Sequence, residues 1–498
     1  MKTAEYSARD ATGLAQLIRS GEVSATEVLD TCIALIEEHN PELNAVICPL
    51  YNEAKAALSA VPADSPFPGV PLLLKDLGHH LAGTPSFSGN AALRDVSPVS
   101  EQNSFIVDKL ASGGFVFPGK TNVPEFGLLG TTEPKAFGPA RNPWSKDRTP
   151  GGSSGGSAAM VAVGAVPLAT ANDGGGSIRI PASYCGLVGL KPSRGVISNG
   201  PHYADLWDGL NSDLVVSRSV RDTVAVLGLL AGNMPGDPYA GPTLDLAAAT
   251  TPVSPPLRVA VATRPLIDVP VDDSAVEATW SMAKLLESFG HTVEEAAPDV
   301  SGDLTTDVFS KVYMSAAAAD YRRVQQIAGK AAAKRGTEAE TRFLAYLGTC
   351  LTGEEYHTAR RDANTLNRGV ADFFGRYDIF LTPTTAGIAH EIGATGPTPM
   401  QSRLSGLVSA LGLGRKVLNS NLLHDTFREM AGRVPFTQLA NICGLPAINL
   451  PAFRDARTGL PVGVMLTAPM GADVQLLQLA AQVEAECDWR HSYPFMSQ

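Results

Sequence analysis

Apolar residues recur along the chain in two patterns that alternate from one end to the other. Short, mostly apolar runs predict strands at 45–48, 69–74, 115–117, 166–171, 187–190, 258–262, 378–381, 447–450 and 462–466, and residues 292–295 are expected to form a further strand. Segments expected to be helical lie at 24–40, 52–60, 104–110, 157–163, 219–231, 274–289, most of 304–376, and 476–487. This alternation predicts an α/β fold with a central mixed β-sheet covered by helices on both faces.

Three stretches interrupt the pattern. Residues 131–156 are rich in Gly, Pro, Asn, Thr and Ser, and residues 233–256 resemble a linker. Residues 395–424 are rich in Gly, Ser and Leu and fit neither period. A loop as long as 131–156 inside a globular chain is usually functional, so this stretch is the first candidate for a site.

Composition narrows the class of protein. The 498 residues are 44% hydrophobic and 18% charged, which excludes a disordered chain and leaves enough apolar material for a large core. The net charge of −11 argues against nucleic acid as a partner. The first residues show no signal peptide. Residues 149–172 carry no charge, but their glycines and Pro167 argue against a membrane span. We therefore expect a cytoplasmic protein.

The densest chemical signal is a glycine cluster that ends in a serine, Asp173-Gly174-Gly175-Gly176-Ser177. Glycines let the backbone adopt turns in which successive N–H groups converge on one point. Acyl transfer needs such donors, because the attacked carbonyl oxygen becomes negative. The cluster is therefore a candidate nucleophile beside a candidate oxyanion hole, while the pattern alone is more typical of a tight turn with an incidental serine.

A serine nucleophile needs a base, and no histidine lies in this region. Lys75 ends the apolar run 69–74, where burial could keep its amine neutral and able to accept a proton. A strand-end lysine paired with a carboxylate such as Asp76 is the alternative. The histidines show no metal-binding spacing, and His79-His80 are adjacent, so we expect neither a metal nor a cofactor.

Together these motifs resemble the amidase signature family of serine hydrolases. The resemblance rests on seven stretches across most of the chain, namely GVPLLLKD (69–76), GKTNVPEFG (119–127), RNPW (141–144), the block 151–195, SRSVRD (217–222), YDIFLTPTT (377–385) and VPFTQLANICGLPAINLP (434–451). NPELNAVI, NPW and the segment from Asn172 to Ser183 look most like the 6-aminohexanoate cyclic dimer hydrolase branch.

The resemblance implies a Ser–cis-Ser–Lys triad. Ser177 is then the nucleophile, Ser153 the bridging serine at a cis peptide bond, and Lys75 the neutral base, while the N–H groups of residues 174–177, including Gly174, Gly175 and Gly176, hold the oxyanion. It further implies an amidase that acts on a small or medium carboxamide without a cofactor. Two residues depart from the usual family pattern, because Gly174 replaces a β-branched residue and Asn172 precedes Asp173. For Asp173 and Arg179 we expect structural hydrogen bonding.

Three alternatives stay open. Residues 151–155 match the GxSxG nucleophile elbow, which would make Ser153 the nucleophile of an esterase with His424 or His491 as base. The chain could instead be an amidotransferase A-type subunit that needs a partner. Ser281 and Lys284 match an SxxK motif, but no supporting motif accompanies them.

Domain organisation follows from the spread of the motifs. Length alone suggests about three domains. However, one site draws on residues from Lys75 to Pro451, which predicts one catalytic domain over residues 1–498. Its signature core covers about 69–232, and a helical region at about 300–425 is expected to specify the substrate. Aryl, linear and cyclic amides and esters all remain possible substrates. A homodimer is our expectation for the assembly.

Overall fold

The apolar runs come together as two sheets in the computed structural model, which describes residues 1–253, 256–395, 399–487, 489 and 493. The larger sheet has eight strands, in the order β4 (Leu168–Asp173), β6 (Ser212–Ser217), β5 (Val188–Lys191), β10 (Ala447–Arg454), β11 (Pro461–Thr467), β9 (Ile379–Pro383), β7 (Arg258–Val261) and β8 (Thr292–Glu295). Neighbours from β4 to β9 are antiparallel, whereas β9, β7 and β8 are parallel. The predicted mixed sheet is thus confirmed.

A smaller sheet of three strands lies beside the first strand of the large one. It contains β1 (Val46–Pro49), β3 (Gly119–Thr121) and β2 (Leu74–Lys75), in that order. A parallel bridge between Leu73 and Ala169 joins the chain before β2 to β4. The end of the apolar run 69–74 therefore reaches the edge of β4, and this contact brings Lys75 to the larger sheet.

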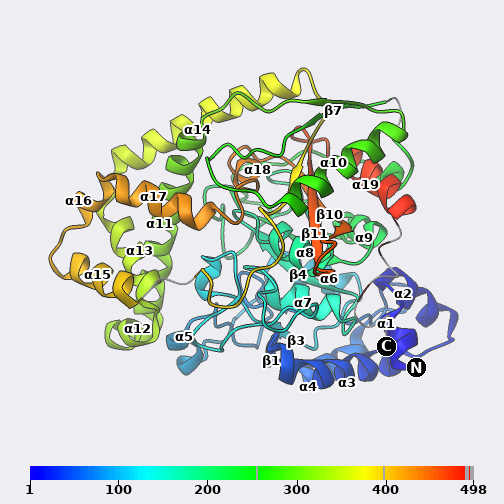
Figure 1. Cartoon of the computed structure of the whole chain (residues 1–498). Helices are drawn as coiled ribbons and strands as arrows, with labels where there is room; N and C mark the ends of the chain where they lie inside the picture. The colour runs from blue at the N-terminus through cyan, green and yellow to red at the C-terminus, as the bar shows by residue number, and fades with distance from the viewer. Residues whose placement is uncertain (254–255, 396–398, 488, 490–492, 494–498) are drawn as a thin grey trace.

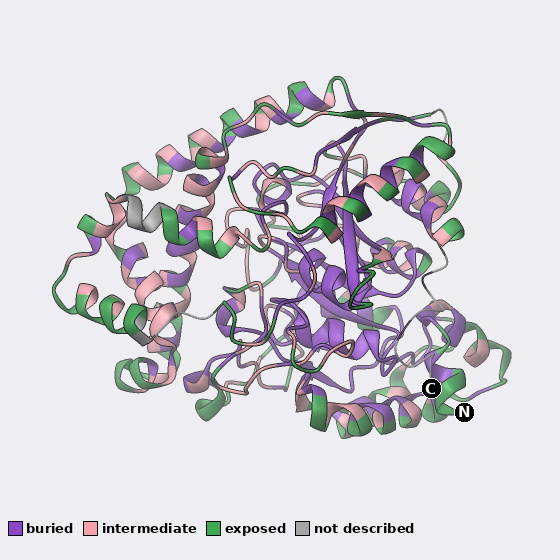
Figure 2. Cartoon of the chain, in the orientation of Figure 1, coloured by how far each residue is buried: buried purple, intermediate pink, exposed green. Residues whose placement is uncertain are grey.

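Helices cover the large sheet on both faces (Figure 1). α7 (Gly155–Ala162) and α8 (Arg179–Cys185) pack on one face, and α9 (Val220–Leu230), α10 (Asp273–Ser288) and α19 (Asp473–Cys487) pack on the other. The buried residues gather in this layered centre (Figure 2). These elements form one α/β domain.

The remaining helices of its N-terminal part are α1 (Thr3–Ser7), α2 (Ala11–Ser20), α3 (Ala25–Leu43), α4 (Tyr51–Ala57), α5 (Ala91–Val96) and α6 (Phe105–Ser112), with the short 3-10 turns η1 (Leu58–Ala60), η2 (Glu125–Gly127) and η3 (Leu246–Ala248).

A group of helices stands beside the sheet core, at the left and top of Figure 1. It consists of α11 (Gly302–Ala328), α12 (Lys330–Gly336), α13 (Ala339–Cys350), α14 (Gly353–Phe374), α15 (Pro399–Ala410), α16 (Gly414–Leu418) and α17 (Asn421–Ala431). α11 is its central helix, because α12, α13, α14 and α17 all contact it. The short α18 (Gln438–Ile442) returns the chain to the sheet.

The capping box at Ser24 and Glu27 starts α3, and Ser219 caps α9 through the N–H of Asp222, in agreement with the predicted helical segments 24–40 and 219–231. Three details differ from the predictions. Residues 115–117 form only an isolated bridge to Pro71, and the strand lies at β3 instead. The strand β6 was not predicted, because its first residues, Ser212 and Asp213, are polar although they are buried. In the described part of 395–424 the chain is largely helical.

The uncharged stretch 149–172 divides into a loop, the buried helix α7 and the start of β4, so it is not one continuous helix. No helix among the described residues is long and apolar enough to cross a bilayer.

Candidate active site

Lys75 ends β2, and its side chain is completely buried. Its Nζ lies 2.7 Å from Ser153 Oγ and 2.5 Å from Asn172 Oδ1, with Asn172 O at 3.4 Å. Burial lowers the pKa of Lys75 to about 7, against the opposing charges of Asp213 and Asp173. A large fraction of the amine is therefore neutral near pH 7 and can accept a hydrogen bond from Ser153.

Asp76 does not serve as the partner of Lys75. Its carboxylate accepts the backbone N–H groups of Phe87 and Ser88 at 3.0 Å each. Burial raises its pKa to about 7, although the charge of Lys120 opposes this shift. The alternative interpretation of Lys75 as a strand-end lysine in an ion pair with Asp76 is thus wrong.

Ser153 lies in the buried loop that precedes α7, and the peptide bond between Gly152 and Ser153 is cis. This loop has no room for side chains at its glycines. A Cβ on Gly152 would overlap the backbone of Thr131, and a Cβ on Gly156 would lie 2.6 Å from the carbonyl oxygen of Ala45. Contacts so close to backbone atoms cannot relax cheaply, which explains why the sequence is glycine-rich here.

Asp173 organises the turn that carries Ser177. The carboxylate of Asp173 accepts the N–H of Gly176 at 2.6 Å and the N–H of Ile178 at 3.2 Å. The guanidinium of Arg179 forms two hydrogen bonds to it, each 2.9 Å long, and both side chains are fully buried. The predicted structural role of Asp173 and Arg179 is therefore confirmed.

The same bonds decide which backbone N–H groups of the turn are free to donate. The N–H of Gly176 already donates to Asp173, so this group is not available to an oxyanion in this conformation. The N–H groups of Gly174, Gly175 and Ser177 have no hydrogen-bond partner within the described chain. A hole built here would use these three donors.

Aromatic side chains stand over the glycine turn. A Cβ on Gly174 would lie 2.8 Å from the ring of Trp207, and one on Gly175 would lie 2.8 Å from Phe309 Cζ. Trp207 meets Phe309 and Tyr313 edge to face, with ring centroids 6.5 and 5.6 Å apart. Phe309 and Tyr313 belong to α11, so the helical group reaches the turn at Ser177. No sequence pattern pointed to these three residues.

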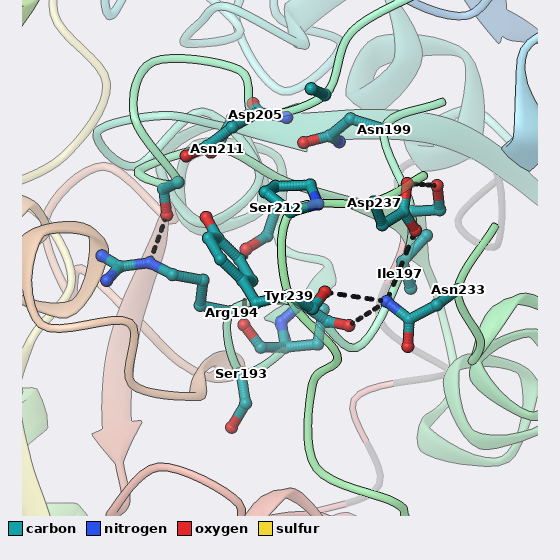
Figure 3. A pocket seen from close by; sticks show the side chains of 16 residues that line it. Ser193, Arg194, Ile197, Asn199, Asp205, Asn211, Ser212, Asn233, Asp237 and Tyr239 are labelled. Atoms are coloured by element: carbon teal, nitrogen blue, oxygen red, sulfur yellow. Dashed lines mark hydrogen bonds between the residues drawn. The ribbon is translucent and has the colours of Figure 1, made fainter. Parts of the chain in front are cut away.

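A polar pocket lies between the loops 192–199, 204–212 and 233–239 (Figure 3). Asn199, Asn211 and Arg194 are among its lining residues, while Lys75, Ser153 and Ser177 are not. In the part of the chain that the structure describes, no three His, Cys, Asp or Glu side chains gather as metal ligands would.

The two motif alternatives find no support in the local structure. No strand leads into Ser153 within 141–152, as a nucleophile elbow requires. The side chain of His424 and all of His491 lie outside the described residues. Ser281 and Lys284 are exposed on α10, away from any described site.

Comparison with known proteins gives a consistent match over the whole chain. A family model described as "Amidase" matches residues 27–477. The 6-aminohexanoate-cyclic-dimer hydrolases of Pseudomonas sp. (strain NK87) and Paenarthrobacter ureafaciens are each 36% identical, over 97% of this chain and 95% of theirs. The solved structure of a 6-aminohexanoate cyclic dimer hydrolase superimposes with a TM-score of 0.88 at 33% identity, covering 99% of both chains.

Proposed function

Because the chain belongs to the amidase signature family of amide-bond hydrolases, we propose that it cleaves carboxamides through an acyl-enzyme on Ser177. The observation that carries the proposal is the 2.7 Å contact between Lys75 Nζ and Ser153 Oγ in a fully buried environment. A buried neutral amine is a base, and the serine that it contacts can pass a proton to it.

Proton movement follows from this arrangement. Ser177 Oγ attacks the carbonyl carbon, its proton passes to Ser153, and the proton of Ser153 passes to Lys75. The N–H groups of Gly174, Gly175 and Ser177 stabilise the oxyanion that forms. When the tetrahedral intermediate collapses, the relay returns a proton to the leaving nitrogen. Water then hydrolyses the acyl ester by the same route, which restores Ser177.

The substrate is a small or medium carboxamide. Trp207 and Phe309 lie against the turn of Ser177 with Tyr313 packed on both rings, and such an apolar wall favours hydrocarbon segments next to the scissile amide. The names of the two relatives support a cyclic dimer of 6-aminohexanoate as the first candidate to test. Linear aliphatic and aryl amides follow it.

Mapping of the acyl group tests the proposal. The purified chain is incubated with this cyclic dimer, a linear amide, an aryl amide and the matching ester, and the labelled residue is located by mass spectrometry. We expect hydrolysis of amides by the chain alone and acylation of Ser177, both lost in Ser177→Ala. Acylation of Ser153 would favour the esterase alternative. Activity only with an added partner would favour an amidotransferase subunit.

A further inference from the structure

Asp213 is a buried carboxylate on the strand next to Asn172. In the register of β4 and β6, Asp213 is the direct partner of Asn172. Directly paired residues of antiparallel strands have their side chains on the same face, with Cβ atoms about 4.5–5.5 Å apart. The side chain of Asn172 contacts Lys75 Nζ at 2.5 Å. Asn172 therefore lies between Lys75 and Asp213 on this face of the sheet.

Three side-chain nitrogens surround Asp213. Asn211 Nδ2 donates to its Oδ1 at 3.0 Å and Asn199 Nδ2 to its Oδ2 at 3.1 Å. His79 Nε2 lies 3.5 Å from Oδ1, and the other ring nitrogen faces Thr170 Oγ1 at 2.8 Å. Thr170 Oγ1 also accepts the backbone N–H of Lys75 at 2.7 Å. Since a carboxylate only accepts, His79 faces Asp213 with a proton on Nε2 in this array.

Asp173, the other carboxylate whose charge acts on Lys75, is already neutralised. Successive side chains of a strand point to opposite faces, so Asp173 lies on the other side of β4 from Asn172. There it forms its two hydrogen bonds with Arg179. Among the described residues no Lys or Arg side chain pairs with Asp213, whose ion-pair contact is with His79 Nε2 at 3.5 Å. Burial disfavours its charge, but the contact with His79 and its charge, together with the hydrogen bonds from Asn211 and Asn199, bring the pKa of Asp213 below the ordinary value.

We propose that Asp213 is a positioning residue that supplies the counter-charge for Lys75 when the lysine takes the proton of Ser153. This inference rests on the proposed function. Lys75 becomes an ammonium ion in a fully buried place, and Asp213 is a carboxylate on the same face of the sheet that pairs with no Lys or Arg side chain among the described residues. Such a charge stabilises the cation that forms during the reaction while it never touches the substrate. Asn199 and Asn211, which line the pocket of Figure 3, hold the carboxylate in place.

Two substitutions separate the charge of Asp213 from its shape. Asp213→Asn keeps the size and removes the charge, whereas Asp213→Glu keeps the charge. For Asp213→Asn we expect kcat to fall about tenfold or more with KM little changed. In the pH profile of kcat/KM, we expect the acid limb to move to lower pH by about one unit, because Lys75 then loses its proton more easily. Asp213→Glu leaves the acid limb at its original pH.

Asp222→Asn is the matched control. Asp222 is a completely buried carboxylate of α9 that binds the N-terminal residues Ala11 and Thr12. Its loss is expected to affect folding stability without moving the acid limb. An unmoved acid limb in Asp213→Asn, or an equal shift in Asp213→Glu, would overturn the inference. Lys75→Ala, assayed in parallel, tests the proposed function separately. Full activity of this variant would show that Lys75 is not the base.

Discussion

Phe309 lies directly against Gly175, the residue two positions before the proposed nucleophile. The ring is so close that a Cβ on residue 175 would approach its Cζ to 2.8 Å. Helix α11 thereby fixes the backbone of the turn whose N–H groups we assign to the oxyanion.

Gly175→Ala tests the importance of this contact. The added methyl group must displace either the ring of Phe309 or the turn itself, and a displaced turn moves the N–H donors away from the oxyanion. Removal of one such donor commonly lowers kcat by about 10²–10³-fold, and we expect a loss approaching this size. Steady-state kinetics measures it. Phe309→Leu in the same chain opens space for the methyl group, so the double variant should recover part of the activity. If the double variant is no better than Gly175→Ala alone, the contact is not the cause.

The pH dependence of the reaction reports the base. Burial lowers the pKa of Lys75 to about 7, and only the neutral amine accepts a proton. The active fraction therefore rises with pH through about 7 and falls as the lysine is protonated below it. We expect kcat/KM to lose about tenfold for each pH unit below this value. Lys75→Arg keeps a positive charge that cannot be lost, so it should show only a trace of activity without this limb. A wild-type limb centred near pH 4.5 would point to a carboxylate instead.

The buried pair of Asp173 and Arg179 governs stability. Both side chains are fully buried, and Arg179 also donates to the backbone oxygen of Thr437 and to Asn441 Oδ1. Arg179→Met would leave the carboxylate buried without its cation, at an expected cost of about 3–5 kcal/mol in the free energy of unfolding. Urea denaturation measures this cost. The exposed pair of Arg258 and Asp378 gives the comparison, since Arg258→Met should cost less than about 1 kcal/mol. Equal costs for both variants would contradict the prediction.

Much of the fold and of the candidate site could be predicted because the relevant signals are local. The apolar runs identified most strands, and Lys75, Ser153 and Ser177 lie in short motifs that depend on glycine or on a strand end. The strand β6 was missed because Ser212 and Asp213 are polar residues satisfied by tertiary hydrogen bonds. Trp207 and Phe309 were also missed. They reach the turn of Ser177 from segments far away in the sequence, and no spacing rule records that contact.

The neighbouring serines 153 and 154 give the most direct test of the relay. Both are buried, yet only Ser153 Oγ contacts Lys75 Nζ, at 2.7 Å, whereas Ser154 Oγ makes a long contact of 3.5 Å with Asn172 O. Ser153→Ala breaks the path of the proton from Ser177 to the lysine. We expect kcat to fall by about 10²-fold or more, with KM changed little.

Ser154→Ala removes a hydroxyl of the same kind from the next residue, and its kcat should stay within a few-fold of the parent chain. Any slow acylation that persists in Ser153→Ala should still occur on Ser177, because the nucleophile and the oxyanion donors are unchanged. Mass spectrometry of the acylated variant establishes this point. A similar loss in both variants would indicate that the loop as a whole has been disturbed and would count against the relay. Loss confined to Ser153 separates the chemistry of its hydroxyl from the packing that both serines share.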